Sequence, residues 1–189
     1  LLEYMGQFDG VIQRGDPLPE VDLQLPILSL PHRLETTLET IPTKVPYILS
    51  NPSAGIDLSA AADLNIGLVW AGRATHKNDR NRSIPIDILR RLFDLDGINW
   101  VSLQVNGAQD DAIAAELPLV DLRPQIEDFA DTAVAVTALD LVISVDTSVA
   151  HLAGALGKEV WILLPFVPDW RWLMDGKPSP WYPTARLFR

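Results

Sequence analysis

The chain has 189 residues, of which 48% are hydrophobic, and a formal net charge of −10. This length holds one ordinary domain, or one domain and part of another, and the apolar share is sufficient for a core. The acidic charge argues against a nucleic-acid partner and against anionic membrane surfaces, because both need a basic face. The apolar runs are only strand-sized, so we expect no membrane span. The absence of cysteine fits a reducing compartment, and we expect a cytoplasmic protein.

Residues 1–50 are rich in proline and lack a regular hydrophobic pattern. They predict a short strand at residues 10–13, an extended segment at 25–30 and a short helix at 33–40, with a linker at 42–52. This part is too small and too interrupted to hold a core of its own. We therefore expect it to pack on the domain that follows or on a partner that is missing from this chain.

From Asn65 onward, strand patterns alternate with short helix patterns. Such alternation forms βαβ units, so we predict an α/β domain over residues 51–189, with a Rossmann-like parallel sheet flanked by helices. The predicted strands are residues 66–70, 99–103, 119–122, 139–145, 160–164 and 185–188. The predicted helices are residues 85–93, 108–116, 128–138 and 148–156.

The most informative segment is residues 139–157, LDLVISVDTSVAHLAGALG. An apolar strand ends at Asp146, and a helix begins at once after the N-cap types Thr147 and Ser148. Such a junction places a helix N-terminus at the carboxyl edge of a parallel sheet. Free backbone N–H groups and the helix dipole bind phosphate there. The alternative is an ordinary strand-to-helix turn with a capping aspartate.

The loop after the first predicted strand concentrates positive charge in an otherwise acidic chain. Its cations are Arg73, Lys77, Arg80 and Arg82. They favour a clamp on a diphosphate, since arginine binds phosphate in a bidentate manner. A solvated loop balanced by nearby carboxylates is the alternative. Gly72 would let the backbone approach a ligand closely, and His76 is a candidate for a catalytic residue.

Further polar residues fall at the same predicted edge of the sheet. His151 follows Thr147 by one helical turn, and it would either donate to a phosphate oxygen or lie satisfied in the core. Asp146 would act as a base or, as strand-end aspartates more often do, accept backbone N–H bonds that fix the loop. Gln104 and Arg123 follow predicted strands, where side chains that contact a base or a ribose would lie.

Residues 165–183 place three tryptophans in one loop. The ring of Trp170 would stack on a sugar or a base, and Asp169 and Arg171 would hydrogen-bond sugar hydroxyls. Alternatively, the aromatic side chains cover the edge of the sheet. The sequence has no metal-ligand cluster, Walker loop, Gly-x-Gly-x-x-Gly or nucleophile elbow. We therefore expect neither a metal nor a cofactor.

Together these motifs resemble the C-terminal half of a family of bacterial glycosyltransferases. Members often follow tetratricopeptide repeats, are related to the ADP-heptose lipopolysaccharide heptosyltransferases, and are more distantly similar to O-linked N-acetylglucosamine transferases. The segments that carry the resemblance are GLVWAG at 67–72, NDRNRSIP at 78–85, DFADTA at 128–133, LVISVDTSVAHLAGALGK at 141–158 and PFVPDWRW at 165–172. The resemblance is strong over about residues 65–189, and residues 9–50 look like the end of the family's N-terminal domain.

The resemblance implies a GT-B architecture, in which two Rossmann-like domains face each other across a cleft. The C-terminal domain of such enzymes binds the nucleotide-sugar donor, typically without a metal. Residues 146–148 and His151 would then meet the donor phosphates, and Arg80 or Arg82 would supply the basic contact of the heptosyltransferase loop. The family usually has glycine where this chain has Ser148. The serine side chain leaves less room for the phosphate to approach the backbone.

By the same resemblance, residues 1–50 would be a remnant of the N-terminal domain, and residues 51–189 the donor-binding domain. The missing part carries the catalytic base and the acceptor site in relatives, so we expect this chain to bind nucleotide but to turn over little. Its partners would be the donor, the rest of that domain and the repeats of a parent chain. The apolar surface left by the missing part would favour a homodimer. The alternatives are a nucleotide-sugar epimerase of the same fold and a non-catalytic protein-interaction module.

Overall fold

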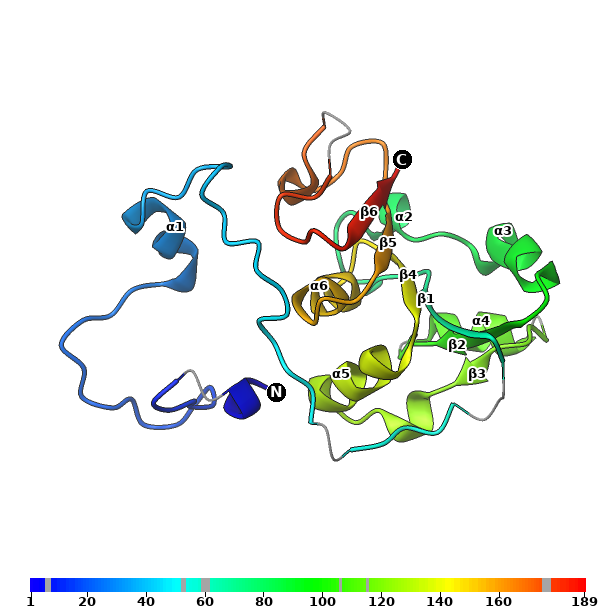
Figure 1. Ribbon diagram of the computed structural model, residues 1–189, viewed down its shortest axis with the longest axis horizontal. Helices are drawn as coiled ribbons and strands as arrows, with labels where there is room; N and C mark the ends of the chain where they lie inside the picture. The colour runs from blue at the N-terminus through cyan, green and yellow to red at the C-terminus, as the bar shows by residue number, and fades with distance from the viewer. Residues whose placement is uncertain (6–7, 52–53, 59–61, 106, 115, 175–177) are drawn as a thin grey trace.

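The computed structural model describes residues 1–189 except 6–7, 52–53, 59–61, 106, 115 and 175–177. Six strands form one parallel sheet in the order β3-β2-β1-β4-β5-β6, with helices on its faces (Figure 1). The strands are β1 (Leu64–Val69), β2 (Ile98–Ser102), β3 (Val120–Asp121), β4 (Leu141–Val145), β5 (Val160–Leu163) and β6 (Ala185–Phe188). This Rossmann-like α/β arrangement confirms the predicted fold class.

The helices of this domain are α2 (Asp79–Arg82), α3 (Ile86–Leu89), α4 (Ala108–Ala114), α5 (Phe129–Ala138) and α6 (Ser148–Ala155). The predicted helix at 85–93 is divided, because α3 passes into a 3-10 segment at Arg90–Asp94. The ends of both long helices lie within one residue of the prediction. Asp128 forms a capping box with Asp131 at the start of α5. At the end of α6, Gly157 takes a φ of 71°.

The strand order creates a switch point between β1 and β4. Chain connections run outward from β1 toward β2 and β3, whereas β4, β5 and β6 extend the sheet on the other side of β1. Leu68 of β1 is in register with Ser102 of β2 on one side and with Ile143 of β4 on the other. The loops after β1 and β4 therefore diverge at the carboxyl edge, where open α/β sheets bind their ligands.

The core lies on both faces of the sheet. On one face, α5 and α6 pack small alanines against the buried side chains of Val142, Ile162 and Leu139. On the other face, Trp70 and Trp100 are the largest members of a second buried cluster. Alternate residues of β1 contribute to opposite clusters, as expected of a strand covered on both sides.

Residues 1–40 form no strand in their described part and extend away from the sheet (Figure 1). The expectations here were wrong: residues 10–13 are irregular, and the segment at 25–30 is not extended. It contains a 3-10 turn at Ile27–Ser29 that leads into α1 (Leu30–Arg33). This helix ends where the predicted helix at 33–40 should begin, and residues 34–40 are not helical. The reason for the early start is Pro31, whose fixed φ favours the first turn of a helix.

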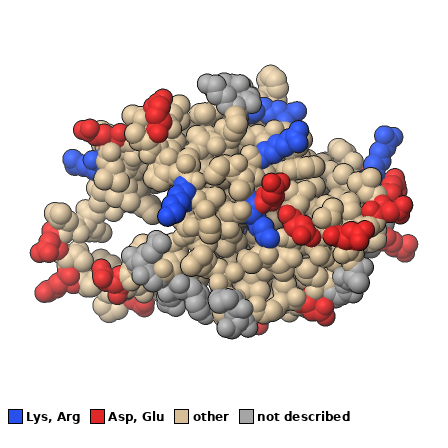
Figure 2. Space-filling model, in the orientation of Figure 1, with Lys and Arg blue, Asp and Glu red and all other residues tan. Residues whose placement is uncertain are grey.

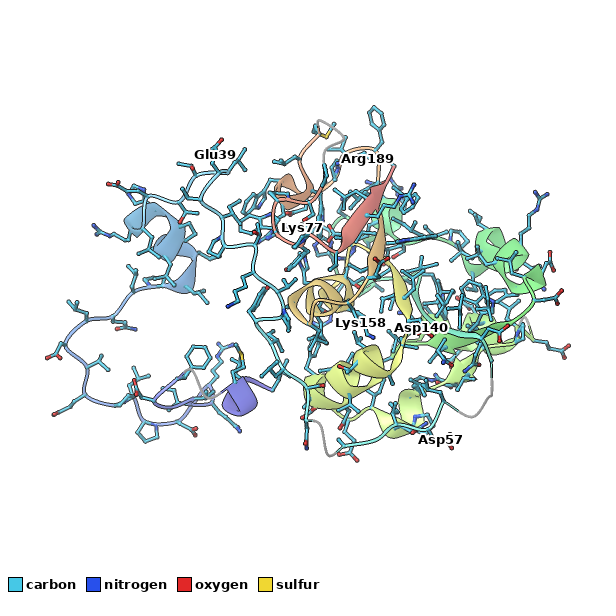
Figure 3. The ribbon with its side chains drawn as sticks, in the orientation of Figure 1. Glu39, Asp57, Lys77, Asp140, Lys158 and Arg189 are labelled. Atoms are coloured by element: carbon cyan, nitrogen blue, oxygen red, sulfur yellow. The ribbon has the colours of Figure 1, made fainter. Side chains whose placement is uncertain are left out.

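The chain then crosses the domain as a strap, which we define as residues 41–51 and 54–58. The backbone N–H of Tyr47 donates to the carbonyl of Ala155 at the end of α6, over 3.0 Å. Asp57 lies near the other end of the strap (Figure 3). Its backbone N–H donates to the side-chain oxygen of Gln125 over 3.0 Å. The predicted domain boundary at residues 50 and 51 falls inside this strap. Within the described part of the chain, no helix has the length and apolar character needed to cross a membrane.

Candidate functional site

Two adjoining cavities open at the carboxyl ends of β1 and β4. The large cavity has a volume of about 770 Å³ and lies between the ends of β1 and β2 and the starts of α4 and α6. The small cavity, of about 510 Å³, lies between the loop after β1, the start of α6 and the loop after β5. Arg82, Thr147 and Ser148 line both cavities. These residues therefore form the junction between the two.

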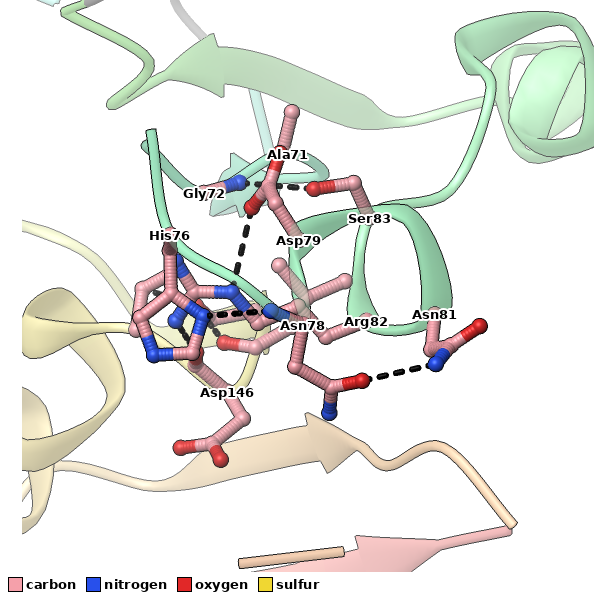
Figure 4. Close-up of polar contacts among 12 residues, drawn as sticks. Ala71, Gly72, His76, Asn78, Asp79, Asn81, Arg82, Ser83 and Asp146 are labelled. Carbon is pink, nitrogen blue, oxygen red and sulfur yellow. Dashed lines mark hydrogen bonds and ion pairs between the residues drawn. The ribbon is translucent and has the colours of Figure 1, made fainter. Parts of the chain in front are cut away.

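Arg82 ties the loop after β1 to the end of β4. Its Nε donates to the carboxylate of Asp79 over 3.1 Å, and its Nη1 donates to the backbone carbonyl of Asp146 over 2.8 Å (Figure 4). The side chain is only 14% exposed. A guanidinium carries five N–H donors in a fixed fork, so these bonds fix its plane at the junction while further donors remain for a ligand.

Gly72 makes room for this arginine. A Cβ at Gly72 would collide with the guanidinium of Arg82 and with the carboxylate of Asp79. The backbone N–H of Gly72 donates to the hydroxyl of Ser83 over 2.9 Å, which closes the loop around α2 (Figure 4). The space that Gly72 leaves is thus filled by side chains of the same loop, and its expected approach to a ligand stays a prediction.

The first turn of α6 presents backbone donors to the junction. Thr147 is the N-cap, but its side chain caps no N–H and instead hydrogen-bonds to the Ser144 hydroxyl over 3.0 Å. No hydrogen bond among the described residues has the backbone N–H of Ser148 or Val149 as its donor. Such groups at a helix N-terminus, with the helix dipole behind them, attract anions.

His151 packs against aromatic side chains and also reaches a cavity. Its ring stacks on buried Trp172, with centroids 4.9 Å apart, and its Nδ1 lies 3.0 Å from the hydroxyl of Tyr182. It nevertheless lines the small cavity, with Nε2 3.8 Å from the Asp146 carboxylate. Burial lowers the pKa of His151, and nearby Arg171 lowers it further, against the opposing effect of Asp146.

The loop after β5 contributes a charged pair to the small cavity. The Asp169 carboxylate accepts the backbone N–H of Arg171 over 3.1 Å and its Nη1 over 2.8 Å. Although burial raises the pKa of Asp169, these hydrogen bonds from Arg171 lower it overall. The Arg171 guanidinium also lies 4.5 Å from the ring centre of Trp170, which is 65% exposed. Asp169 and Arg171 thus face the small cavity, and Trp170 lies outside its lining.

The structure also brings His76 to the site. It lines the small cavity, and its Nδ1 accepts the backbone N–H of Asn78 over 3.2 Å. By contrast, Arg80 is exposed and belongs to the lining of neither cavity in the described chain. Lys and Arg side chains gather around the C-terminal end of β6 in Figure 2, on a surface where acidic side chains dominate elsewhere.

Gln104 and Arg123 are both engaged in fixing the structure. The Gln104 side chain accepts the backbone N–H of Ala71 over 3.0 Å and donates to its carbonyl over 2.8 Å, so it holds the end of β1 from inside the large cavity. Arg123 pairs with Asp121 and Asp110, whose hydrogen bonds raise the pKa of the guanidinium. It does not line either cavity among the described residues.

Sequence reasoning missed several residues of the site. Asp111 reaches the large cavity from α4, and Asp79 reaches it from α2. α4 is the first helix after β2, so the position of Asp111 in the helix after a predicted strand was an available signal. Tyr182 lies 31 positions after His151, and no sequence spacing points to their contact. The described residues contain no group of three or more His, Asp or Glu side chains able to hold a metal.

Comparison with known proteins gives one distant relative. No protein-family model matches the chain, and no solved structure matches it. The chain is similar to protein FlbA of Caulobacter vibrioides, with 24% identity in a match that covers 99% of this chain and 31% of that protein. The chain therefore spans about a third of the length of this curated relative.

Proposed function

We propose that this chain is the donor-binding half of a GT-B glycosyltransferase and that it binds a nucleotide diphosphate sugar. The observation that carries the proposal is the junction of the two cavities. There, the guanidinium of Arg82 and the backbone N–H of Ser148 belong to residues that line both cavities at the switch point of the sheet, and Val149 follows on the wall of the large cavity. A diphosphate at the junction would receive charge-assisted hydrogen bonds from both sources.

The two cavities suit the two ends of such a donor. Apolar walls from Val69, Leu103 and Val149 in the large cavity fit a planar base, and the Asp111 carboxylate would accept ribose hydroxyls. In the small cavity, Asp169 and Arg171 offer an acceptor and a donor for sugar hydroxyls. Volumes of about 770 and 510 Å³ lie in the usual range for ligand pockets.

The proposed chemistry is transfer of the sugar to a hydroxyl acceptor. The acceptor oxygen attacks the anomeric carbon, the bond from that carbon to the diphosphate oxygen breaks, and a base takes the acceptor proton. Negative charge grows on the departing diphosphate in the transition state. Arg82 and the N-terminus of α6 would stabilise that charge from fixed positions, without reorganising during the reaction.

The test is calorimetric titration of the chain with UDP, GDP, ADP and CMP, without and with magnesium. We expect one nucleotide to bind, and Arg82→Gln to weaken it at least ~10-fold, because a charge-assisted contact is lost. Arg80→Gln, on the same short helix but outside both cavities, should stay within about two-fold of the parent. Thermal unfolding of both variants controls for damage to the fold.

Three outcomes would contradict the proposal. Equal affinity of the Arg82→Gln variant would remove the junction from the binding site. Failure of every nucleotide and of the corresponding nucleotide sugars would instead favour a protein-interaction module. The donor should also stay unchanged when it is incubated without acceptor, since an epimerised product would indicate an epimerase.

A further inference from the structure

The ring of His151 is held from two directions. One ring face stacks on Trp172, with the planes inclined by 20°. On one edge, Nδ1 lies 3.0 Å from the hydroxyl oxygen of Tyr182. The opposite edge carries Nε2, which faces the small cavity and lies 3.8 Å from the Asp146 carboxylate. The hydrogen bond to Tyr182 therefore decides which nitrogen the cavity meets.

Helix α6 provides the place where Tyr182 lies. A Cβ at Gly154 would collide with the Tyr182 ring, so the ring lies directly on the backbone of α6. Gly154 follows His151 by three positions, and residues at this spacing share one face of a helix. Tyr182 is only 7% exposed. The glycine thus fixes the height of the phenol beside the imidazole.

Both neighbours of the imidazole favour a proton on Nε2. Burial raises the pKa of Tyr182, so the phenol keeps its proton. The phenol has a single proton to donate, so a bond to Nδ1 of His151 leaves Tyr47 of the strap to donate its own hydroxyl to the Tyr182 oxygen. A protonated phenol can donate to the unprotonated nitrogen of a neutral imidazole. On the other edge, the carboxylate oxygen of Asp146 can only accept, which favours N–H at Nε2.

The charged groups around His151 come from two loops. Asp146 follows β4, and Asp169 and Arg171 follow β5. Burial is the strongest influence and lowers the pKa of His151, Arg171 acts in the same direction, and both carboxylates act against it. The result is a pKa below the usual value, so the ring is neutral at pH 7 and carries one proton.

We propose that Tyr182 is a positioning residue that donates its O–H to Nδ1 and thereby holds His151 as the neutral tautomer with N–H on Nε2. That N–H is an uncharged donor on the wall of the small cavity. That this N–H donates to an oxygen of the donor sugar or diphosphate rests on the proposed function. The tautomer itself depends only on the contacts of Tyr182 and Asp146 and is testable without any ligand.

The experiment is ¹⁵N–¹H long-range correlation NMR of the full chain, which distinguishes the two neutral tautomers of each histidine. We expect His151 to carry its proton on Nε2. Tyr182→Phe keeps the ring on Gly154 but removes the donor, so Nδ1–H should become populated. The protonation constant of His151 should rise about two- to ten-fold, because the neutral ring loses the free energy of one neutral hydrogen bond. Tyr47→Phe, one hydrogen bond farther away, should change it less.

An Nδ1–H tautomer in the parent protein would overturn the inference, and so would an unchanged tautomer and protonation constant in the Tyr182→Phe variant. Backbone amide spectra establish that the variant is folded. In the titrations above, Tyr182→Phe should weaken nucleotide diphosphate sugar binding about two- to ten-fold. If no nucleotide binds to the parent, the proposed function fails while the tautomer measurement still decides the role of Tyr182.

Discussion

His151 gives the folded chain a pH dependence that can be assigned to one side chain. Burial lowers its pKa in the folded state, whereas the unfolded chain has the ordinary value of about 6.5. The unfolded state therefore binds a proton first as the pH falls. The stability contributed by neutral His151 is complete above about pH 6.5 and is lost as the pH falls through the lower, folded value.

We expect the free energy of unfolding in urea to decrease between pH 7.5 and pH 5. A His151→Gln variant should be flatter over this interval, because glutamine does not titrate. The lowered pKa values of Asp121 and Asp169 act at still lower pH, outside this interval. His76→Gln is the matched control on an exposed histidine of the same site. An equal slope in the parent and in His151→Gln would show that another group is responsible.

At the scale of elements, Gln104 joins the ends of two strands that the site requires. Its buried side-chain oxygen accepts the backbone N–H groups of Trp70 and Ala71, over 3.2 and 3.0 Å, where β1 leaves the sheet. A Gln104→Leu substitution keeps the volume but leaves those donors without this acceptor. We expect it to lower the free energy of unfolding by about 1–3 kcal/mol, measured by urea denaturation.

The matched control for this prediction is Gln125→Leu, which removes two exposed hydrogen bonds between the Gln125 side chain and the backbone of Asp57 in the strap. It should cost less than about 1 kcal/mol, because water can replace those bonds. A Gln104→Leu variant as stable as the parent would mean that the end of β1 does not depend on Gln104 for its position.

Elements with a strong hydrophobic period could be predicted from the sequence, and those without one could not. The β4–α6 unit agrees with the prediction because β-branched apolar residues, cap types and Gly157 all indicate the same boundaries. α2 has the sequence DRNR, which contains no apolar residue, and it was missed. The N-terminal predictions failed because isolated apolar residues between prolines do not distinguish a strand from a turn.

The same distinction holds for the candidate site. Residues that directly follow β1 and β4 were predictable, because carboxyl ends of parallel strands share one edge. The choice of Arg82 over Arg80 needed the structure, since only their directions from α2 differ. The role of Tyr182 could not be predicted from the sequence for the same reason. Its contact with His151 depends on the packing of a distant loop against Gly154.

For the whole molecule, the first 40 residues and the strap contribute very differently to stability. Leu18, Leu23 and Leu28 are 74–90% exposed, so the N-terminal segment buries little. Ile48, Ile56 and Leu58 of the strap pack against the core. We expect a chain that starts at residue 41 to unfold at nearly the same temperature as the parent and to bind the same nucleotide.

A chain that starts at residue 62 is the comparison, because it also lacks the strap. It should lose roughly 3 kcal/mol or more, the worth of burying a few aliphatic side chains. Differential scanning calorimetry of the two truncated chains and the parent checks this. Equal stability of the two truncated chains would show that the strap is dispensable for the domain.

The shared wall of the two cavities has a consequence for avidity. Arg82, Thr147 and Ser148 border both spaces, so the occupants of the two cavities meet at one point. Two separate fragments would each lose translational freedom on binding, whereas a single molecule that spans the junction loses it once. The covalent link raises the effective concentration of the second fragment at its cavity. The affinity would therefore depend mainly on the covalent link between the two parts of the ligand. Cutting a spanning ligand in two would weaken its binding far more than shortening either end.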